Sequence, residues 1–185
     1  MDSSNNNNQE SLSLKEEIFE WLDTCVKTVV VTLGLFTFVF ALSTVKQCSM
    51  FPTLDDNDKV IMYSFMYKPK YKDIIVITQP NARNHNLVKR VIATGGQTID
   101  IDPKAGKVFI DGEELEEDYI YEPTFRVADV KFPVTVPKGY IFAMGDNRNN
   151  SADSRDAWVG MIDERYVRGK VVFRVWPIKK FGVVR

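Results

Sequence analysis

Histidine is almost absent from this chain of 185 residues, which has one, His85, and two cysteines, Cys25 and Cys48. A zinc site built from cysteine and histidine is therefore excluded, and the cysteines have no metal-ligand spacing. They flank one long apolar run, and a helix there would separate them by about 34 Å at roughly 1.5 Å per residue. They cannot pair within such a helix. We expect neither a metal nor a cofactor.

A surplus of charge of either sign is also missing. Lys and Arg number 24 and Asp and Glu 25, which gives a net charge of −1. The chain lacks the basic character that is typical of nucleic-acid-binding proteins, so we exclude nucleic acid as a partner. It also lacks an internal repeat. Its length suits one domain of ordinary size plus an anchor.

Long apolar runs are limited to residues 28–45, TVVVTLGLFTFVFALSTV, which carry no charge. This length can cross roughly 30 Å of hydrocarbon, so we predict a transmembrane helix. The alternatives are a buried core helix, which would need a larger protein around it, and a cleaved secretory signal. The preceding segment is long and acid-rich, unlike the short basic start of a signal. Lysines on both sides of the run leave its orientation open.

The chain before this run is polar. Residues 1–9, with four asparagines in a row, are expected to be disordered, and residues 12–26 have the periodicity of an amphipathic helix. We therefore divide the chain into a polar N-terminus with an amphipathic helix (1–27), a transmembrane helix (28–45) and a β-rich domain (46–185).

After Leu54 the helical period gives way to short runs rich in Val, Ile, Tyr and Phe, separated by Pro, Gly and Asn. This pattern predicts a mainly β fold, with an antiparallel sheet or barrel-like domain of about 130 residues. The predicted strands are 59–63, 73–78, 87–93, 98–101, 107–110, 134–136, 140–144 and 169–175.

Ser49 lies directly after the apolar run, in Cys48-Ser49-Met50-Phe51-Pro52-Thr53-Leu54. A serine in such a turn is usually a hydrogen-bonding turn residue. It becomes a nucleophile where a neighbouring base removes its proton. His85 belongs to a polar loop, where we expect a solvated side chain, so a Ser-His-Asp triad is not indicated.

Lys89 is the better candidate for a base, because apolar neighbours surround it in the predicted strand 87–93. A free lysine titrates at about 10.4, but burial lowers its pKa and allows it to accept a proton from serine. The alternative is an edge-strand lysine that prevents aggregation.

A dense polar segment, Gly145 to Asp156, follows the predicted strand 140–144. As a calcium loop it would have Ser151 where the sharp turn needs glycine and Ala157 where the bidentate glutamate belongs. The alternative is a turn network, in which Asx and Ser side chains cap the backbone and arginines pair with carboxylates.

Together these segments resemble the type I signal peptidases, membrane-bound Ser-Lys proteases that remove signal peptides from exported preproteins. The resemblance extends over about residues 45–182 and follows the family's order. Three strings carry it: Ser49-Met50 with Pro52-Thr53-Leu54, Lys89-Arg90-Val91-Ile92, and Gly145-Asp146-Asn147-Arg148 through Ser151-Ala152-Asp153-Ser154-Arg155.

The resemblance implies that Ser49 is the nucleophile, Lys89 the general base and Ser151 the serine that orients this lysine. It also implies two ion pairs that brace the site and a set of substrate-binding residues, with the backbone around Leu87 pairing with the substrate. The ion pairs are Arg90 with Asp146 and Asp153 with Arg155, and the substrate-binding residues are Met50, Leu54, Leu87, Val88 and Ala152.

Gln47 and Cys48 depart from the family's pattern. The family often has Ser, Thr or Gly at the position of Gln47, where a hydroxyl helps the Ser49 amide to stabilise the oxyanion. Loss of one such donor lowers the rate by roughly 100- to 1000-fold. The side-chain amide of Gln47 can replace it, so we expect Ser49 and Gln47 to supply the oxyanion donors.

The function implied is a serine endopeptidase that removes N-terminal signal peptides from preproteins after small residues, with the lipid bilayer as a second partner. Its catalytic domain would lie on the extracytoplasmic face of the cell membrane. A rival enzyme, a LexA-like self-cleaving Ser-Lys protein, needs a DNA-binding domain where this chain has the apolar run. A rival of another class is a membrane-tethered, non-catalytic β binding module.

Overall fold

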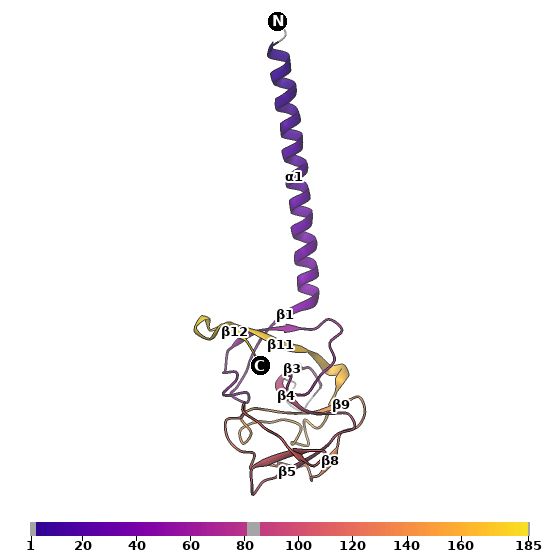
Figure 1. The fold of residues 1–185 in the computed structure, drawn as a ribbon, viewed down its shortest axis with the longest axis vertical. Coiled ribbons are helices and arrows are strands. Elements are labelled where there is room, and N and C mark those ends of the chain that lie inside the picture. Colours follow the sequence, from indigo (N-terminus) through magenta and orange to yellow (C-terminus); the bar gives the residue numbers. More distant parts are fainter. Residues whose placement is uncertain (1–2, 81–85, 185) are drawn as a thin grey trace. The chain divides into compact units, whose positions relative to one another are not determined.

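The computed structural model describes residues 3–80 and 86–184, with side chains from residue 15 onward (Figure 1). It separates into two compact units, Met1–Val39 and Phe40–Arg185. The first is helical, and the second contains the β-strands of the described residues. The prediction of a mainly β fold with one N-terminal apolar helix is confirmed.

Helix α1 runs from Ser3 to Val39 without a break. It therefore includes most of the segment 1–9, for which the sequence predicts disorder, and it joins the predicted amphipathic helix to the predicted span. Its part Lys15–Val39 is long and apolar enough to cross a membrane, with a mean hydropathy of 1.7. Asp23 and Lys27 within this part form an ion pair at 2.6 Å, which partly offsets the cost of placing these charges in a bilayer.

The end of the helix differs from the prediction of a span over 28–45. Helix α1 ends at Val39, and Phe40–Thr44 form strand β1, which pairs antiparallel with β2 (Lys59–Tyr63). A run without charge does not by itself distinguish a helix from a strand, and Phe, Leu, Thr and Val are compatible with either. The charge-free run therefore contains both the end of the helix and an edge strand.

The larger of the two sheets is antiparallel throughout and has eight strands from the described ranges. The sequence predicts the five longest strands after β1, but it does not predict β1, β10 or β12. In spatial order the strands are β1, β2, β11 (Val167–Trp176), β3 (Ile74–Ile77), β4 (Leu87–Thr94), β9 (Tyr140–Met144) and β10 (Ile162–Asp163), with β12 (Gly182–Val183) paired to β11.

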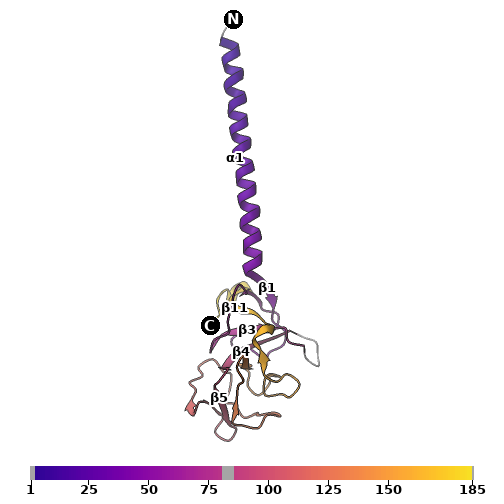
Figure 2. The ribbon, with the colours of Figure 1, turned by 90° about the vertical axis from the view of Figure 1, so that its right-hand side faces the viewer.

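A smaller antiparallel sheet follows β4 in the chain (Figure 1). Its order is β7 (Glu113–Glu114), β6 (Lys107–Ile110), β5 (Thr98–Asp102) and β8 (Val134–Thr135). Two 3₁₀ turns, η1 (Glu164–Tyr166) and η2 (Ile178–Lys180), flank β11. Figure 2 shows β5 below β4. Ile99 and Val108 of the small sheet share an apolar cluster with Ile92 and Phe142 of the large one, so the two sheets pack against each other.

Strand β4 is the centre of this unit, because its inner six residues are buried. Val88 packs in one apolar cluster, Val91 in a second and Ile92 in a third. Alternate residues of a strand point to opposite faces, so a strand covered on both faces holds its side chains rigidly. This rigidity extends to Lys89 and Arg90, which lie between these apolar residues.

The position of β1 can be tested with a disulfide. Leu42 lies directly opposite Ile61 on β2, where paired residues bring their Cβ atoms within about 4.5–5.5 Å. We expect the variant Leu42→Cys/Ile61→Cys, made in a Cys25→Ser/Cys48→Ser background, to form a disulfide that a non-reducing gel detects. The matched control Leu42→Cys/Lys59→Cys is out of register and should not. A helix that continued through residue 44 would give no crosslink in either variant.

Candidate active site

The turn that carries Ser49 is anchored in the core at both ends. Met50 and Leu54 are fully buried, and the backbone N–H of Leu54 donates to the carbonyl of Met50 at 2.9 Å. A second turn bond joins the N–H of Phe51 to the carbonyl of Cys48 at 3.1 Å. Ser49 itself is 9% exposed, so its hydroxyl lies at the edge of the domain interior. The turn therefore fixes this hydroxyl in one place.

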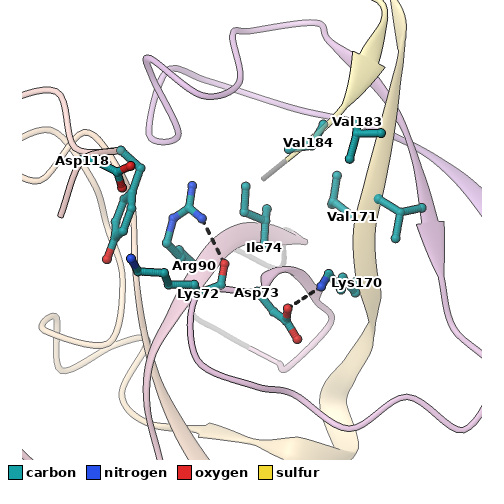
Figure 3. A pocket seen from close by; sticks show the side chains of 11 residues that line it. Lys72, Asp73, Ile74, Arg90, Asp118, Lys170, Val171, Val183 and Val184 are labelled. Atoms are coloured by element: carbon teal, nitrogen blue, oxygen red, sulfur yellow. Dashed lines mark hydrogen bonds and ion pairs between the residues drawn. The ribbon is translucent and has the colours of Figure 1, made fainter. Parts of the chain in front are cut away.

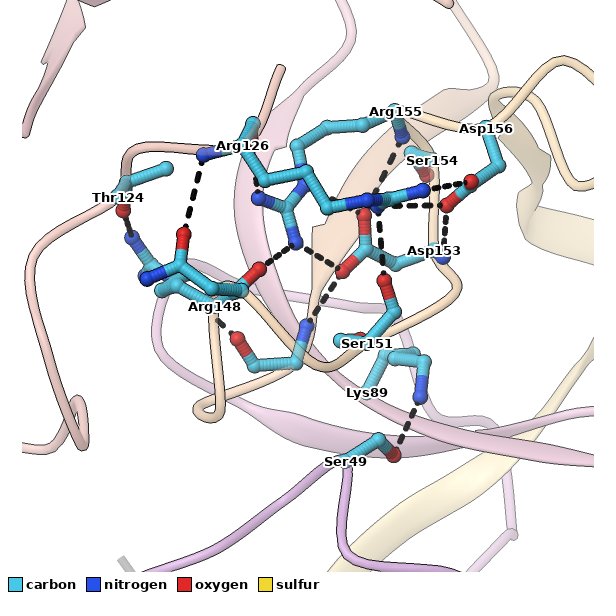
Figure 4. Close-up of polar contacts among 12 residues, drawn as sticks. Ser49, Lys89, Thr124, Arg126, Arg148, Ser151, Asp153, Ser154, Arg155 and Asp156 are labelled. Atoms are coloured by element: carbon cyan, nitrogen blue, oxygen red, sulfur yellow. Dashed lines mark hydrogen bonds and ion pairs between the residues drawn. The ribbon is translucent and has the colours of Figure 1, made fainter. Parts of the chain in front are cut away.

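Lys89 reaches the same place from β4, as Figure 4 shows. Its Nζ lies 2.6 Å from the Oγ of Ser49, and the residue is 3% exposed. Burial lowers the pKa of the Lys89 ammonium to about 8, against the opposing attraction of the Asp153 carboxylate. A lysine that is partly neutral near physiological pH and in hydrogen-bond contact with a serine can act as its base.

Asp153 and Arg155 form a fully buried ion pair in the segment after β9. The Nε and Nη2 atoms of Arg155 each lie 2.8 Å from a carboxylate oxygen of Asp153. Burial opposes ionisation of Asp153, but the hydrogen bonds and charge of Arg155 hold the pKa of this carboxyl below its usual value. Asp153 also accepts the backbone N–H of Gly145 at 3.0 Å, which closes the segment into a loop.

Arg90 and Asp146 form the second predicted pair. The Nε and Nη2 atoms of Arg90 lie 2.8 and 2.7 Å from the two carboxylate oxygens of Asp146, and both side chains are buried. The Thr53 hydroxyl donates to Asp146 at 2.6 Å. This contact connects the turn that carries Ser49 to the segment after β9. The structure thus brings together both pairs of residues named from the sequence.

Two further contacts at the site are not predicted from the sequence. The backbone N–H of Asn147 donates to the Ser49 carbonyl at 3.1 Å, and its side-chain amide donates to the Cys48 carbonyl at 3.2 Å. Buried Arg148 donates to Glu117 at 2.7 Å. The density of polar residues in the segment 145–156 signals a network, but it does not identify Glu117, which is distant in sequence.

The carboxylates of the segment 145–156 are engaged by arginines. Asp146 pairs with Arg90, Asp153 with Arg155, and Asp156 with Arg126. These contacts support the turn network over a calcium loop, because a calcium site needs its carboxylates for the ion. Among the described residues, no group of three or more His, Cys, Asp or Glu is placed to hold a metal. His85 lies outside the described residues.

Ser151 belongs to the same segment 145–156. Its hydroxyl does not form the predicted hydrogen bond with Lys89. Its Oγ is the one buried side-chain oxygen or nitrogen in the described part of the chain that has no hydrogen-bond partner. Such a group costs about 1–3 kcal/mol when left unpaired. A Cβ added at Gly145 would lie 2.3 Å from this Oγ and 2.4 Å from the Ser49 carbonyl oxygen. Only glycine fits between the two serines.

A groove of about 760 Å³ passes over Ser49 and Lys89. Leu87, Val88 and Ala152 line it as predicted for substrate-binding residues. Met50 and Leu54 do not, because they are buried in the core, and Met62 of β2 supplies apolar lining instead. Strands β1 and β4 both line the groove although three strands separate them in the sheet, so the sheet is curled.

Gln47 lines the same groove with an exposed side chain. Its backbone has a positive φ of 67°, and its N–H donates to the Asp56 carboxylate at 2.7 Å. Among the described residues, none accepts a hydrogen bond from the Ser49 N–H. Both predicted oxyanion donors therefore lie at the groove surface. Cys48 is exposed, and its sulfur accepts from Asn150 at 3.4 Å.

A second cavity, of about 550 Å³, has Arg90 rather than Lys89 in its lining (Figure 3). Arg90 donates across it to the Lys72 carbonyl at 3.0 Å, and Lys170 pairs with Asp73 at 2.6 Å. Because neighbouring residues of a strand point to opposite faces, β4 presents its lysine to the groove and its arginine to this cavity. The two spaces are thus separated by β4.

Substitution of Gly145 by alanine tests the contact between the two serines. We expect Gly145→Ala to lower the labelling of Ser49 by a serine-directed acylating probe by roughly 100-fold, because a shift of about 1 Å in a reactive group can have this effect. The double variant Gly145→Ala/Ser151→Ala should not recover, since the clash with the Ser49 carbonyl remains. Lys138→Ala, an exposed position outside this loop, is the control. Normal labelling of Gly145→Ala would contradict the close approach of the two serines.

Comparison with known proteins gives matches over most of the chain. A family model described as signal peptidase, peptidase S26, matches residues 18–176. Signal peptidase I of Leptolyngbya laminosa is 36% identical over 176 residues, which cover 89% of this chain and 83% of that protein. Signal peptidase I of Bacillus licheniformis is 33% identical over 182 residues, with coverages of 93% and 96%.

Signal peptidase IB of Staphylococcus aureus is 33% identical over 186 residues, which cover 91% of this chain and 94% of that protein. A crystal structure of a signal peptidase I from Enterococcus faecalis is 30% identical and covers 56% of this chain and 97% of that chain, with a TM-score of 0.47. Together with the apolar helix α1, the sequence matches indicate a membrane-anchored protein. The chain belongs to the signal peptidase family, peptidase S26.

Proposed function

We propose that this protein is a membrane-anchored signal peptidase, a serine endopeptidase that cleaves N-terminal signal peptides from exported preproteins after small residues. The catalytic pair is Ser49 and Lys89. The single observation that carries the proposal is the 2.6 Å contact between the Ser49 hydroxyl and the buried Lys89 amine. The alternative of a non-catalytic β binding module gives no reason for a lysine to be buried against a serine, and the family relationship does not favour it.

Acyl transfer follows from this contact. Neutral Lys89 accepts the Ser49 proton while the serine oxygen attacks the carbonyl of the last signal-peptide residue. The resulting lysine ammonium then protonates the leaving amine of the mature protein as the peptide bond breaks, which leaves an ester on Ser49. Water, deprotonated by Lys89, hydrolyses that ester and releases the signal peptide with a free carboxylate. Lys89 and Ser49 return to their starting states.

The negative charge on the attacked oxygen is stabilised by two donors, the backbone N–H of Ser49 and the side-chain amide of Gln47. The Ser49 N–H donates to no acceptor among the described residues, and the Gln47 side chain is exposed in the groove. Donors that are already in position before the reaction stabilise the transition state more than the ground state. Gln47 takes the place that a hydroxyl residue often has in this family.

Ser151 is a positioning residue for Lys89. Its buried hydroxyl has no partner among the described residues, and it belongs to the loop that carries Asp153. A hydrogen bond between this hydroxyl and the Lys89 amine would give the hydroxyl a partner and hold the amine in line with Ser49. This hydrogen bond would remove the free-energy cost of leaving the Ser151 hydroxyl unpaired, and that gain favours it.

The substrate binds as an added strand. β4 pairs with β3 from Leu87, but its pairing with β9 begins at Arg90, so one edge of Leu87–Lys89 remains open to the groove. An extended peptide can hydrogen bond to this edge, with alternate side chains entering pockets lined by Leu87, Val88 and Ala152. Shallow apolar pockets favour small residues at the first and third positions before the cut.

The anchor acts through proximity. A preprotein whose signal sequence lies in the bilayer and an enzyme held in the same bilayer meet in two dimensions, which raises their effective concentration. Because exported preproteins are cut after crossing, the catalytic domain lies on the extracytoplasmic face.

Substitution of the catalytic pair gives the direct test. We expect Ser49→Ala and Lys89→Ala each to lower the cleavage of a preprotein in detergent by at least about 1000-fold, because the nucleophile and its base act as a unit. Lys104→Ala, in an exposed turn, should keep parental activity. Parental activity in either active-site variant, measured by loss of the precursor on a gel, would refute the assignment.

The pH profile tests the state of Lys89. Its ammonium cannot accept a proton, and its pKa in the free protein is about 8, so kcat/KM should rise about tenfold per pH unit up to about pH 8 and then level off. At pH 6 roughly 1% of the lysine is neutral. Circular dichroism over the same range separates this loss from acid unfolding. A flat profile between pH 6 and 8 in the folded protein would be incompatible with a lysine base.

A further inference from the structure

Arg168 interrupts the regular pairing of β11 with β3. Val167 lies opposite Ile77 and Gly169 opposite Val76, so Arg168 is an extra residue in the ladder, a β-bulge. Bulges redirect a side chain and are frequent next to active sites. Arg168 is exposed, and it lines the groove that passes over Ser49. The fold therefore directs a cation into the proposed substrate path.

The strand register gives the position of Arg168 along the groove. Ile77 pairs onward with Leu87, Val76 with Val88 and Ile75 with Lys89. Arg168 therefore lies level with Leu87 and Val88, displaced from Lys89 toward the start of β4. If the substrate follows the open edge with its first residue before the cut beside Ser49, its third residue lies near Leu87. Residues further upstream then pass the end of the groove where Arg168 is exposed.

Arg168 has no partner for its charge among the described residues. In the described ranges no carboxylate pairs with its guanidinium and no group accepts a hydrogen bond from it, whereas Arg165 and Arg174 pair with Asp163 and Asp58. The carboxylate in the groove lining, Asp56, already accepts from the backbone of Gln47 and the side chain of Asn57. Arg168 has five N–H donors in a fork that matches a carboxylate.

We propose that Arg168 is a specificity-determining residue, which binds a carboxylate side chain of the signal peptide four to six residues before the scissile bond and repels a lysine or arginine there. This inference rests on the proposed function and adds a charge preference to the preference for small residues. Attraction of one charge and repulsion of the other both contribute to the discrimination. Because the side chain is exposed, each contribution is modest and weakens as salt is added.

Charge-exchange cleavage assays test this proposal. The full chain in detergent is given preproteins with Glu, Gln or Lys placed singly at the fourth, fifth and sixth positions before the cut, and kcat/KM is measured for each. We expect the parental enzyme to prefer Glu over Lys by about fivefold or more at one of these positions. Arg168→Glu should invert this ratio, and Arg168→Lys should keep its direction. The ratio should approach 1 at 1 M salt.

Arg165→Glu is the matched control. Arg165 lies close in the chain, is strongly exposed and does not line the groove, so its reversal should leave the Glu-to-Lys ratio unchanged. Equal ratios in the parent and Arg168→Glu at all three positions would overturn the inference, as would an equal inversion by Arg165→Glu. If Arg168→Glu does not fold, Arg168→Gln must abolish the preference. Failure of the parental enzyme to cleave the unmodified preprotein would instead refute the proposed function.

Discussion

The unfavourable burial of one ammonium group determines how this site is built. Lys89 is held in β4 between residues of three apolar clusters, and this burial brings its pKa down to about 8. Asp153 opposes the effect, because a nearby carboxylate favours the charged lysine. Arg155 binds both oxygens of Asp153 and opposes that attraction with its own charge. The arginine thereby favours the neutral form of a lysine that it does not contact.

Buried ion pairs hold the remaining parts of the site in register. Arg90, Arg148 and Arg155 are almost completely buried, and each pairs with a carboxylate. Such pairs add little net stability compared with apolar residues, but loss of one partner costs about 3–5 kcal/mol. Here they join segments that are distant in sequence, since Arg90 on β4 meets Asp146 after β9 and Thr53 in the nucleophile turn. The ion pairs therefore hold these segments in fixed positions relative to one another.

The sequence was sufficient for the features that depend on local pattern. Short Val- and Ile-rich runs predict the longer strands after β1, and the family resemblance implies the two ion pairs, whose residues lie in the second and third of its three strings. It was insufficient for features that depend on contacts between segments distant in the chain. Phe40–Thr44 became a strand because β2 pairs with it, and no local signal marks that change. Met50 and Leu54 belong to the turn that carries Ser49, yet they anchor it in the core and do not line the groove. Glu117 carries no motif, so only the fold reveals its contact with Arg148.

The residues just before the nucleophile show how local strain and catalysis can be combined. A non-glycine residue at positive φ, such as Gln47, is disfavoured by about 1–2 kcal/mol. The bond from its N–H to Asp56 offsets part of this penalty, and the Cys48 carbonyl is held by Asn147. These bonds fix the backbone that leads into Ser49. The Gln47 side chain remains exposed in the groove. In the proposed mechanism the Gln47 amide stabilises the oxyanion from this turn, and that role would give a reason for a strained backbone at this position.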